Sequence, residues 1–447
     1  MELEYITTTY KNKKTCTDRR HHMFIEDVKN VEKGVINLYP EMCFQTIFGF
    51  GGALTESAGY VLGKLDPETQ KDILNSYYSQ DGLCYTMART HIDSCDFSLG
   101  HYAAMDNSND SELTTFSLER AHKYALPLFK QANEAAGKPL ITMLTPWTPP
   151  AFMKTNCNRD NGGYLREEYY TLWAKYICKY VQEYKANGVD VRLLSVQNEP
   201  NATQTWDSCL FTATHEREFI RRHLGPELRR TGLSDIALLI WDHNKERAFD
   251  RAIDVISDPE MDSLIAGVAV HWYSGDHFEA LQLIHHAFPG KRIVFSEACI
   301  EYLVVEGQNQ LTNAQMYGHE LIGNLNNGLD TFLDWNIILD QNGGPNHAGN
   351  YCDAPIICDL RTGRWAKNLS YYYIGHFSKY IKPQAKRIGY SKFSQELEIT
   401  AVKNPDGSLC AVIMNPQDKD ISFVLRIMGK ICPLAARACS INTCLIK

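Results

Sequence analysis

The sequence lacks any run of about 20 apolar residues, the length that a helix needs to cross a bilayer. Its first residues, Met1 to Tyr5, have neither the basic start nor the apolar stretch of a secretory signal. It has no long run of lysine and arginine, and its net charge is −8. A basic surface is the usual mark of nucleic-acid binding. We therefore expect a cytoplasmic protein that has no membrane span and no nucleic-acid partner.

The sequence also lacks the spacings that mark metal sites. Its 14 cysteines are scattered and none forms a Cys-x-x-Cys pair. His243 and His271 follow apolar runs, but no two histidines stand at the spacing of zinc ligands. Scattered cysteines without a secretion signal are typical of free thiols in a reducing compartment. We predict free thiols, no metal and no cofactor, and we make no prediction of the oligomeric state.

Short apolar runs do alternate with longer helical patterns between about residues 46 and 380. The runs are continuous, which is typical of parallel strands that are buried on both faces. Eight such units predict a (β/α)₈ barrel, because an open doubly wound sheet would carry a Gly-x-Gly-x-x-Gly turn after its first strand. Helices are expected over residues 117–136, 167–187, 278–286 and 312–326. The eight candidate strands are Thr46–Phe48, Tyr85–Arg89, Leu140–Leu144, Leu193–Gln197, Ala237–Trp241, Gly267–His271, Arg292–Ser296 and Thr331–Trp335.

The two ends of the chain follow a different pattern. After about residue 383, short alternating segments are separated by turn signals such as Asn404-Pro405-Asp406-Gly407, which predicts antiparallel strands. We predict that residues 1–42 and 383–447 form a β-sandwich together, and that residues 43–382 form the barrel.

Two of the predicted barrel strands end in a glutamate. One apolar run ends in Asn198-Glu199-Pro200, and a second ends in Ser296-Glu297. Hydrolysis of a glycosidic bond with retention requires two such carboxyl groups, about 5–5.5 Å apart. Glu199 fits the general acid, whose pKa should be raised by burial and by a neighbouring carboxylate. Glu297 fits the nucleophile, which must stay ionised.

Other side chains at the same predicted barrel end fit supporting roles. Arg89, at the tip of the second strand, is the natural cationic partner of Glu297, and Tyr273 is a candidate phenolic donor. Six further residues are candidates for contacting a sugar: Glu56, Trp147, Asn198, His243, Trp335 and Asn346.

Several stretches of the sequence, taken in order, resemble glycoside hydrolase family 30, the glucosylceramidase group. The resemblance implies a (β/α)₈ barrel with a side β-sandwich built from both chain ends. It implies that Glu199 is the acid/base and Glu297 the nucleophile of a double displacement, and that the peptide bond between Trp335 and Asn336 is cis. The stretches are Phe48–Glu56, Ser94–Ser98, Thr145–Asn156, Asn198–Pro200, Val268–Tyr273, Ser296–Ala298 and Asp334–Asn346.

Two positions depart from the family pattern. Glu56 stands where a shorter aspartate is expected, and His347 follows Asn346 where an aromatic residue is expected. We predict a retaining, exo-acting β-glucosidase or glucosylceramidase-like enzyme that acts on a soluble β-glycoside or short oligosaccharide. β-Xylosidase, β-fucosidase and endo-β-1,6-glucanase are alternatives, and the non-enzyme alternative is an inactive barrel that binds carbohydrate. A dinucleotide-dependent enzyme would need a phosphate-binding loop, and the sequence has none.

Overall fold

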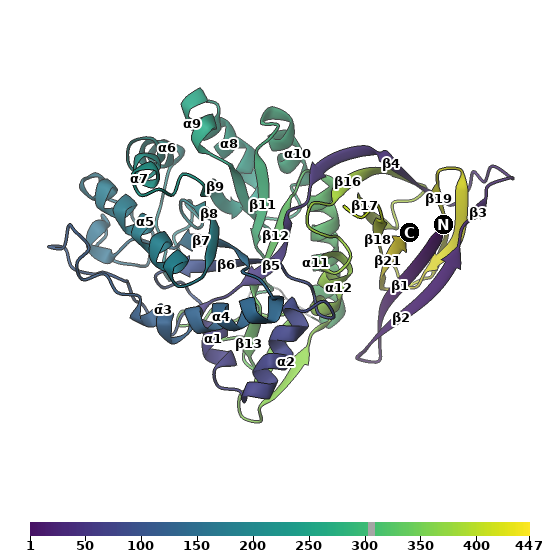
Figure 1. Cartoon of the computed structure of the whole chain (residues 1–447), viewed down its shortest axis with the longest axis horizontal. Helices are drawn as coiled ribbons and strands as arrows, with labels where there is room; N and C mark the ends of the chain where they lie inside the picture. Colours follow the sequence, from purple (N-terminus) through teal and green to yellow (C-terminus); the bar gives the residue numbers. More distant parts are fainter. Residues whose placement is uncertain (303–308) are drawn as a thin grey trace.

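Eight parallel strands close into a barrel, as the sequence predicts (Figure 1). The structure is a computed structural model that describes residues 1–302 and 309–447. Around the barrel the strands stand in the order β10, β11, β12, β5, β6, β7, β8, β9. Their bounds are β5 (Gly49–Ala53), β6 (Met87–Ile92), β7 (Ile141–Pro146), β8 (Asp190–Ser195), β9 (Ala237–Asn244), β10 (Gly267–His271), β11 (Arg292–Glu297) and β12 (Thr331–Asn336).

The predicted position of the first strand, Thr46–Phe48, is wrong. The strand is the glycine-rich segment Gly49–Ala53, a composition that ordinarily argues against a strand. Glycine is required there because the neighbouring strand lies so close. A Cβ atom on Gly51 would stand 2.0 Å from the carbonyl oxygen of Met87.

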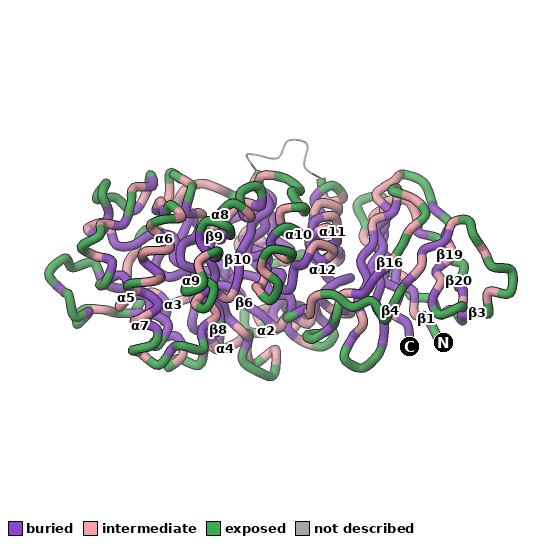
Figure 2. Tube along the Cα trace, turned by 90° about the horizontal axis from the view of Figure 1, so that it is seen from above, coloured by how far each residue is buried: buried purple, intermediate pink, exposed green. Residues whose placement is uncertain are grey.

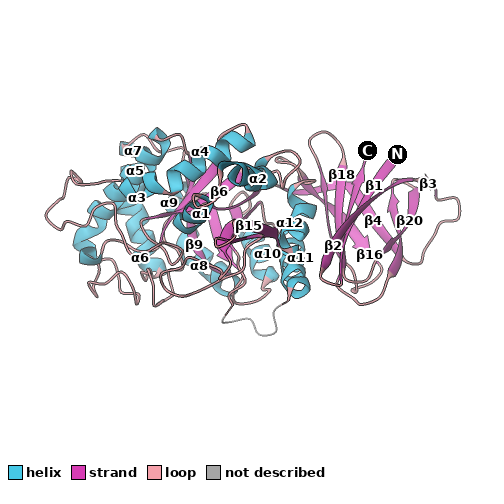
Figure 3. Cartoon of the chain, turned by 90° about the horizontal axis from the view of Figure 1, so that it is seen from below, coloured by secondary structure: helices cyan, strands magenta, loops and turns pink. Residues whose placement is uncertain are grey.

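Helices cover the outside of the barrel (Figure 3). The helix expected from Ser117 is divided at Tyr124, whose φ of −131° interrupts the helical backbone. The stop expected at Gly188 is confirmed, because α5 ends at Ala186 and Gly188 has a φ of +84°. The helices are α1 (Glu56–Leu62), α2 (Pro67–Tyr78), α3 (Glu119–Lys123), α4 (Ala125–Ala136), α5 (Tyr170–Ala186), α6 (Ala213–Phe219), α7 (Gly225–Arg230), α8 (Ala248–Ile256), α9 (Pro259–Leu264), α10 (Phe278–Ala287), α11 (Gln310–Asn326) and α12 (Leu369–Ser378). Within the described ranges, none of them has the length and apolarity that a bilayer span requires.

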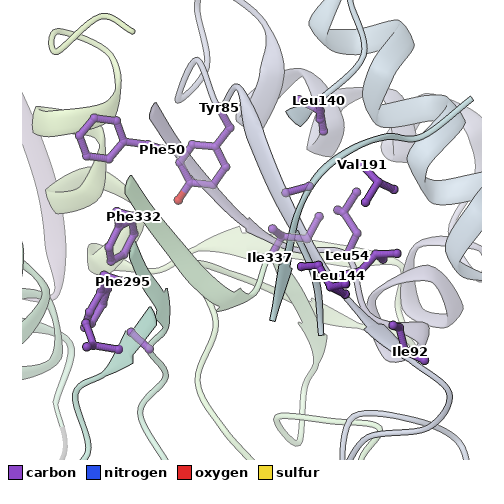
Figure 4. Packing of buried hydrophobic residues seen from close by; sticks show 14 of the residues in the cluster. Phe50, Leu54, Tyr85, Ile92, Leu140, Leu144, Val191, Phe295, Phe332 and Ile337 are labelled. Carbon is purple, nitrogen blue, oxygen red and sulfur yellow. The ribbon is translucent and has the colours of Figure 1, made fainter. Parts of the chain in front are cut away.

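The barrel is packed on both sides of its strands. Inside it, strand side chains such as Met87, Leu193 and Leu333 form a dry layer. Outside it, rings fill the space between strands and helices. Phe295 and Phe332 stack with their centroids 5.3 Å apart (Figure 4). The barrel strands are therefore buried, and exposure in this part of the chain is concentrated on the outer loops and helices (Figure 2).

Both chain ends join one ten-stranded sheet, which forms the β-sandwich beside the barrel (Figure 1). β1 lies between β2 and β21, so the first and last strands are hydrogen-bonded neighbours. β4 continues through residue 42 and leads into the barrel; the segment boundaries at residues 42 and 382 stay predictions. The strands are β1 (Glu2–Lys11), β2 (Lys14–Met23), β3 (Ile25–Glu26), β4 (Val35–Thr46), β16 (Lys386–Lys392), β17 (Glu398–Lys403), β18 (Leu409–Asn415), β19 (Ile421–Ile427), β20 (Lys430–Ala436) and β21 (Ser440–Ile446). A smaller sheet contains β13 (Ile338–Asp340), β14 (Ile356–Asp359) and β15 (Arg364–Lys367).

A buried histidine joins the barrel to the sandwich. His376 on α12 lies 2.8 Å from the hydroxyl of Thr8 on β1 and 2.8 Å from the hydroxyl of Thr443 on β21. One imidazole nitrogen donates and the other accepts, so the neutral ring satisfies both hydroxyls. Burial lowers the pKa of His376 to about 3.

His376 should make the fold sensitive to acid. The unfolded chain takes up this proton near pH 6.5 and the folded chain near pH 3, so folding is penalised progressively between these values, by about 1.4 kcal/mol per pH unit. We expect the free energy of unfolding of His376→Gln to fall less steeply over this range than that of the wild type, in urea titrations at several pH values. The exposed His286→Gln is the control. Parallel profiles for all three proteins would contradict this role.

Candidate active site

The structure brings together the two glutamates that the sequence singles out. Glu199 follows β8, and Glu297 is the last residue of β11. One carboxylate oxygen of each, together with a ring nitrogen of His271, lies in a group whose atoms are all within 4.8 Å of one another. This proximity agrees with the short separation expected from the sequence.

Left-handed backbone at the ends of two strands orients Glu199 and its neighbour Asp242. Glu199 has a φ of +45°, and its N–H donates to the carbonyl oxygen of Asp242 over 2.9 Å. Trp241 and Asp242 have φ values of +73° and +50°, and the pairing of β9 with β10 shifts register at this point. Left-handed backbone at three non-glycine residues is rare and concentrates at functional sites. The bulge turns Asp242 towards the centre of the barrel end.

Glu297 is held by the two residues predicted to surround it. Arg89 Nη1 donates to Oε2 over 2.5 Å, and the hydroxyl of Tyr273 donates to Oε1 over 2.9 Å. Arg89 is fully buried and also donates to Asp242 and to Asn198 Oδ1. Both oxygens of Glu297 therefore accept a hydrogen bond, one from a cation and one from a phenol.

Glu199 is bound to a buried histidine that the sequence reasoning did not assign. His271 Nδ1 lies 3.2 Å from Glu199 Oε1, and its Nε2 lies 3.1 Å from Asp242 Oδ1. Burial alone would lower the pKa of His271, but the charge of Glu297 and the hydrogen bonds to Asp242 and Glu199 raise it to about 9. The imidazole is therefore protonated at neutral pH and bridges two carboxylates.

The expected rise in the pKa of Glu199 is wrong for the free protein. Burial acts in the expected direction, but the hydrogen bond to His271, with the nearby His243, lowers the pKa to about 2. The proton that a general acid would carry lies on His271 instead. Because the two groups are in contact, they titrate as a pair.

Asp242 is a second functional candidate that sequence reasoning missed. It accepts from Arg89 Nη2 over 3.0 Å and from the hydroxyl of Ser296 over 2.5 Å. Burial would raise its pKa, but the Arg89 charge and the His271 hydrogen bond lower it, so the carboxylate is ionised. Its place directly after an apolar run was a signal. The bulge that turns it inward leaves no mark in the sequence.

Two tryptophans form an aromatic wall beside this network. The rings of Trp147 and Trp335 are stacked with centroids 5.2 Å apart, and the Arg89 guanidinium lies over both. The expected cis peptide between Trp335 and Asn336 is wrong, since the cis bond of the described chain is Gly344–Pro345. A register shift between β12 and β5 at Trp335 redirects the backbone there instead.

Asn346 contacts a buried acid, Asp96. Asp96 lies in the stretch Ser94–Ser98 that resembles the family, but the sequence did not predict it as a site residue. Asn346 Nδ2 donates to Asp96 Oδ2 over 3.2 Å. Burial and the charge of Glu297 raise the pKa of Asp96 well above its ordinary value. Asp96 comes from the loop that follows β6 and is therefore a further buried polar group near Glu297.

Two predicted residues stand apart from the group. Both oxygens of Glu56 are engaged, by Arg120 and by the N–H of Leu99. His243 packs its ring on Trp241, with centroids 5.0 Å apart, and reaches the site through its proximity to Glu199. Their assignment as sugar ligands stays a prediction.

A hollow of about 270 Å³ opens beside Tyr273. Tyr273 and Cys299 line it, with Met316 and Glu301. Burial, with the charges of Glu199 and Glu297, raises the pKa of Glu301 to about 7. Tyr273, which donates to Glu297, is therefore the residue that the hollow shares with the hydrogen bonds of the site.

Known proteins are similar to this chain in sequence and in fold. The chain is 35% identical to the lysosomal acid glucosylceramidase of Mus musculus over 407 residues, which are 88% of this chain and 79% of that protein. It superimposes on the crystal structure of SrfJ from Salmonella typhimurium with a TM-score of 0.96 at 36% identity, covering 100% and 99% of the two chains. An endo-β1,6-glucanase structure gives a TM-score of 0.88 at 26% identity, with the same coverage.

Family models cover nearly the whole chain. The glycosyl hydrolase family 30 TIM-barrel domain matches residues 47–381, and the beta sandwich domain of that family matches residues 384–444. With its strand-tip glutamates in contact range and its sandwich built from both ends, the chain belongs to glycosyl hydrolase family 30 and is a glycosidase.

Proposed function

We propose that the protein hydrolyses β-glucosides with retention of configuration, with Glu297 as nucleophile and Glu199 as acid/base. The observation that carries this is the pair of carboxylates within 4.8 Å of each other in different surroundings. Glu297 is bound by a cation and a phenol, whereas Glu199 is bound by a protonated imidazole. Two carboxyl groups whose environments divide the roles of acid and nucleophile are the requirement of a retaining glycosidase.

The reaction proceeds in two displacements. Glu297 Oε attacks the anomeric carbon while Glu199 gives a proton to the glycosidic oxygen, so the C–O bond breaks and a glycosyl ester of Glu297 forms. Glu199 then takes a proton from water, whose oxygen attacks the same carbon and releases Glu297. Arg89 and Tyr273 hold the carboxylate ready for attack and accept it back as the leaving group.

His271 supplies the proton for the first step. In the free protein the Glu199–His271 pair holds one proton, located on the imidazole. Its movement along the 3.2 Å contact converts Glu199 to the acid. Asp242, on the other side of the ring, keeps the imidazole oriented. The ionised Glu199 that remains after the first step is the form that activates water.

The sugar lies against Trp147 and Trp335 and binds Asp96, Asn346 and Asn198. Arg89 occupies Asn198 Oδ1, which leaves the amide N–H groups to donate to the hydroxyl beside the reacting carbon. Glucose is the sugar because relatives with two different actions, a glucosylceramidase and an endo-β1,6-glucanase, both act on glucosides by name. We propose exo action on a soluble β-glucoside, with the aglycone in the hollow beside Tyr273.

The second candidate is an endo-β-1,6-glucanase. The full-length superposition on such an enzyme favours it. A panel of aryl β-glycosides that differ in the sugar distinguishes β-xylosidase and β-fucosidase activities from β-glucosidase activity.

We expect one sugar in a panel of aryl β-glycosides, the glucoside, to be turned over. Glu297→Gln should lose on the order of 10⁴-fold or more in kcat, because an amide cannot form the ester. The exposed Glu112→Gln is the matched control and should keep full activity. If β-1,6-glucan is cleaved and no aryl glucoside is, the enzyme is endo-acting and not exo-acting. A folded protein that binds sugars and cleaves none would overturn the enzyme proposal.

Glu199→Ala should separate substrates by their leaving groups. Alkyl β-glucosides need protonation and should lose about 10²–10⁴-fold in the rate of the first step. Dinitrophenyl β-glucoside needs none, so its burst of phenolate should persist while steady-state turnover slows. The measurement is rapid-mixing absorbance for both substrates. Equal losses in the first step for both leaving groups would rule out Glu199 as the acid.

The alkaline limb of the pH profile should report the Glu199–His271 pair. The wild type should lose kcat/KM as pH rises through about 9, because the pair then gives up its only proton. His271→Gln leaves the proton on Glu199 alone, whose ordinary pKa is about 4.3, so this limb should move to lower pH by about 2 units or more. The profile is measured on an alkyl glucoside. An unmoved alkaline limb would show that His271 does not hold the proton.

A further inference from the structure

A second cluster of metal-ligating side chains lies beside the sugar site. His101 follows β6, Asp207 follows β8, and His347 follows β13, so three loops meet at one point. His101 Nδ1 and His347 Nε2 each lie 3.2 Å from the same atom, Asp207 Oδ2. The imidazole centroids are 4.5 Å apart with the rings at 74°. One atom from each residue falls in a group of three within 4.8 Å of one another.

The carboxylate is built to present a single oxygen to the two rings. Asp207 is fully buried, and its Oδ1 accepts from the hydroxyl of Ser94 over 2.7 Å and from Arg159 Nε over 2.8 Å. Oδ2 is left for His101 and His347.

The other nitrogen of His101 also has the partner that a metal-bound histidine needs. Asp160 Oδ2 lies 3.3 Å from His101 Nε2. A ligating histidine ordinarily donates its second ring N–H to a carboxylate, which fixes the ring and makes the ligand atom more basic. The cluster therefore has outer partners for two of its three ligands, His101 and Asp207.

We propose that His101 Nδ1, His347 Nε2 and Asp207 Oδ2 bind one divalent transition-metal ion, with zinc as the preferred ion. Zinc bonds of about 2.0–2.1 Å in a tetrahedral site place neighbouring ligand atoms about 3.3–3.4 Å apart, close to the two separations of 3.2 Å. Two imidazoles and one carboxylate suit zinc and its neighbours, whereas magnesium and calcium prefer oxygen alone. The carbonyl oxygen of Cys95, 3.1 Å from His347 Nε2, or a water completes the coordination.

The ion would join three loops at the edge of the sugar site. His347 is next to Asn346, which contacts Asp96, and Cys95 precedes Asp96. Binding therefore holds these sugar-facing groups in place without contacting the reacting carbon. The expected effect of the ion is on the stability of the protein and on KM, not on the chemical step.

Zinc titration of the metal-free, full-length protein tests the proposal. We expect calorimetry to show one zinc per chain above any binding by thiols, and zinc to raise the melting temperature. His101→Gln and His347→Gln should each weaken this site more than 10-fold, and Asp160→Asn by about 10–100-fold. His101 is half exposed, so its variant should fold even where His347→Gln does not.

Two matched controls give the result its meaning. Glu297→Gln removes a carboxylate from the only other candidate cluster found in the described residues, Glu199, His271 and Glu297, and should bind zinc like the wild type. The exposed His286→Gln should also be unchanged. Thiol binding is common to all variants and cancels in the comparison. Three results would overturn the proposal. They are no zinc binding by the wild type, binding by the His101 and His347 variants that is as tight as that of the wild type, and loss of binding in Glu297→Gln.

Discussion

A single buried guanidinium organises the active end of the barrel. Arg89 has no exposed surface, and it contacts Glu297, Asp242 and Asn198 while its plane lies over two indole rings. A buried cation is tolerated only when its charge and its hydrogen bonds are satisfied. Those requirements fix the positions of residues at or just after the ends of three strands, β8, β9 and β11. Glu297 is thus one of several groups that the same ion holds in place.

Charge balance then determines where the proton lies. Arg89 offers one positive charge to two carboxylates, Asp242 and Glu297, so their neighbourhood retains a negative charge. His271 compensates by taking up a proton and sharing it between Asp242 and Glu199. Glu199 is therefore ionised, and the proton lies one hydrogen bond away on His271. This arrangement follows from burial, because water cannot screen the excess charge.

The sequence predicts which residues end the buried strands, but not where a strand bulges or where two strands pack closely. Glu199 and Glu297 follow continuous apolar runs, so their place at the barrel end could be read directly. The first strand could not, because glycine there reflects a close approach of Met87, a feature of packing alone. The orientation of Asp242 could not be predicted either, because it depends on a bulge in β9 that has no sequence signature.

The cluster of His101, Asp207 and His347 could not be predicted, because its residues are far apart in the sequence. A search for histidines at ligand spacing finds local pairs, whereas His101 and His347 stand on loops of different strands and meet only when the barrel closes. The proximity of Glu199 and Glu297 could be anticipated because the two strand tips lie on one end of a barrel. The side-chain partners that set the pKa of Glu199 could not, since they depend on angles of a few side chains.

The pairing of β1 with β21 constrains how the chain reaches this structure during synthesis. Thr7 and Asn442, which hydrogen-bond across these strands, are 435 residues apart. At about 5–20 residues per second, β1 leaves the ribosome roughly 20–90 s before its partner exists. In that interval β1 can form its hairpin with β2, but its other edge stays open to wrong strands. The edge of β1 that β21 covers in the finished structure is therefore without its native partner until the last residues of the chain are made.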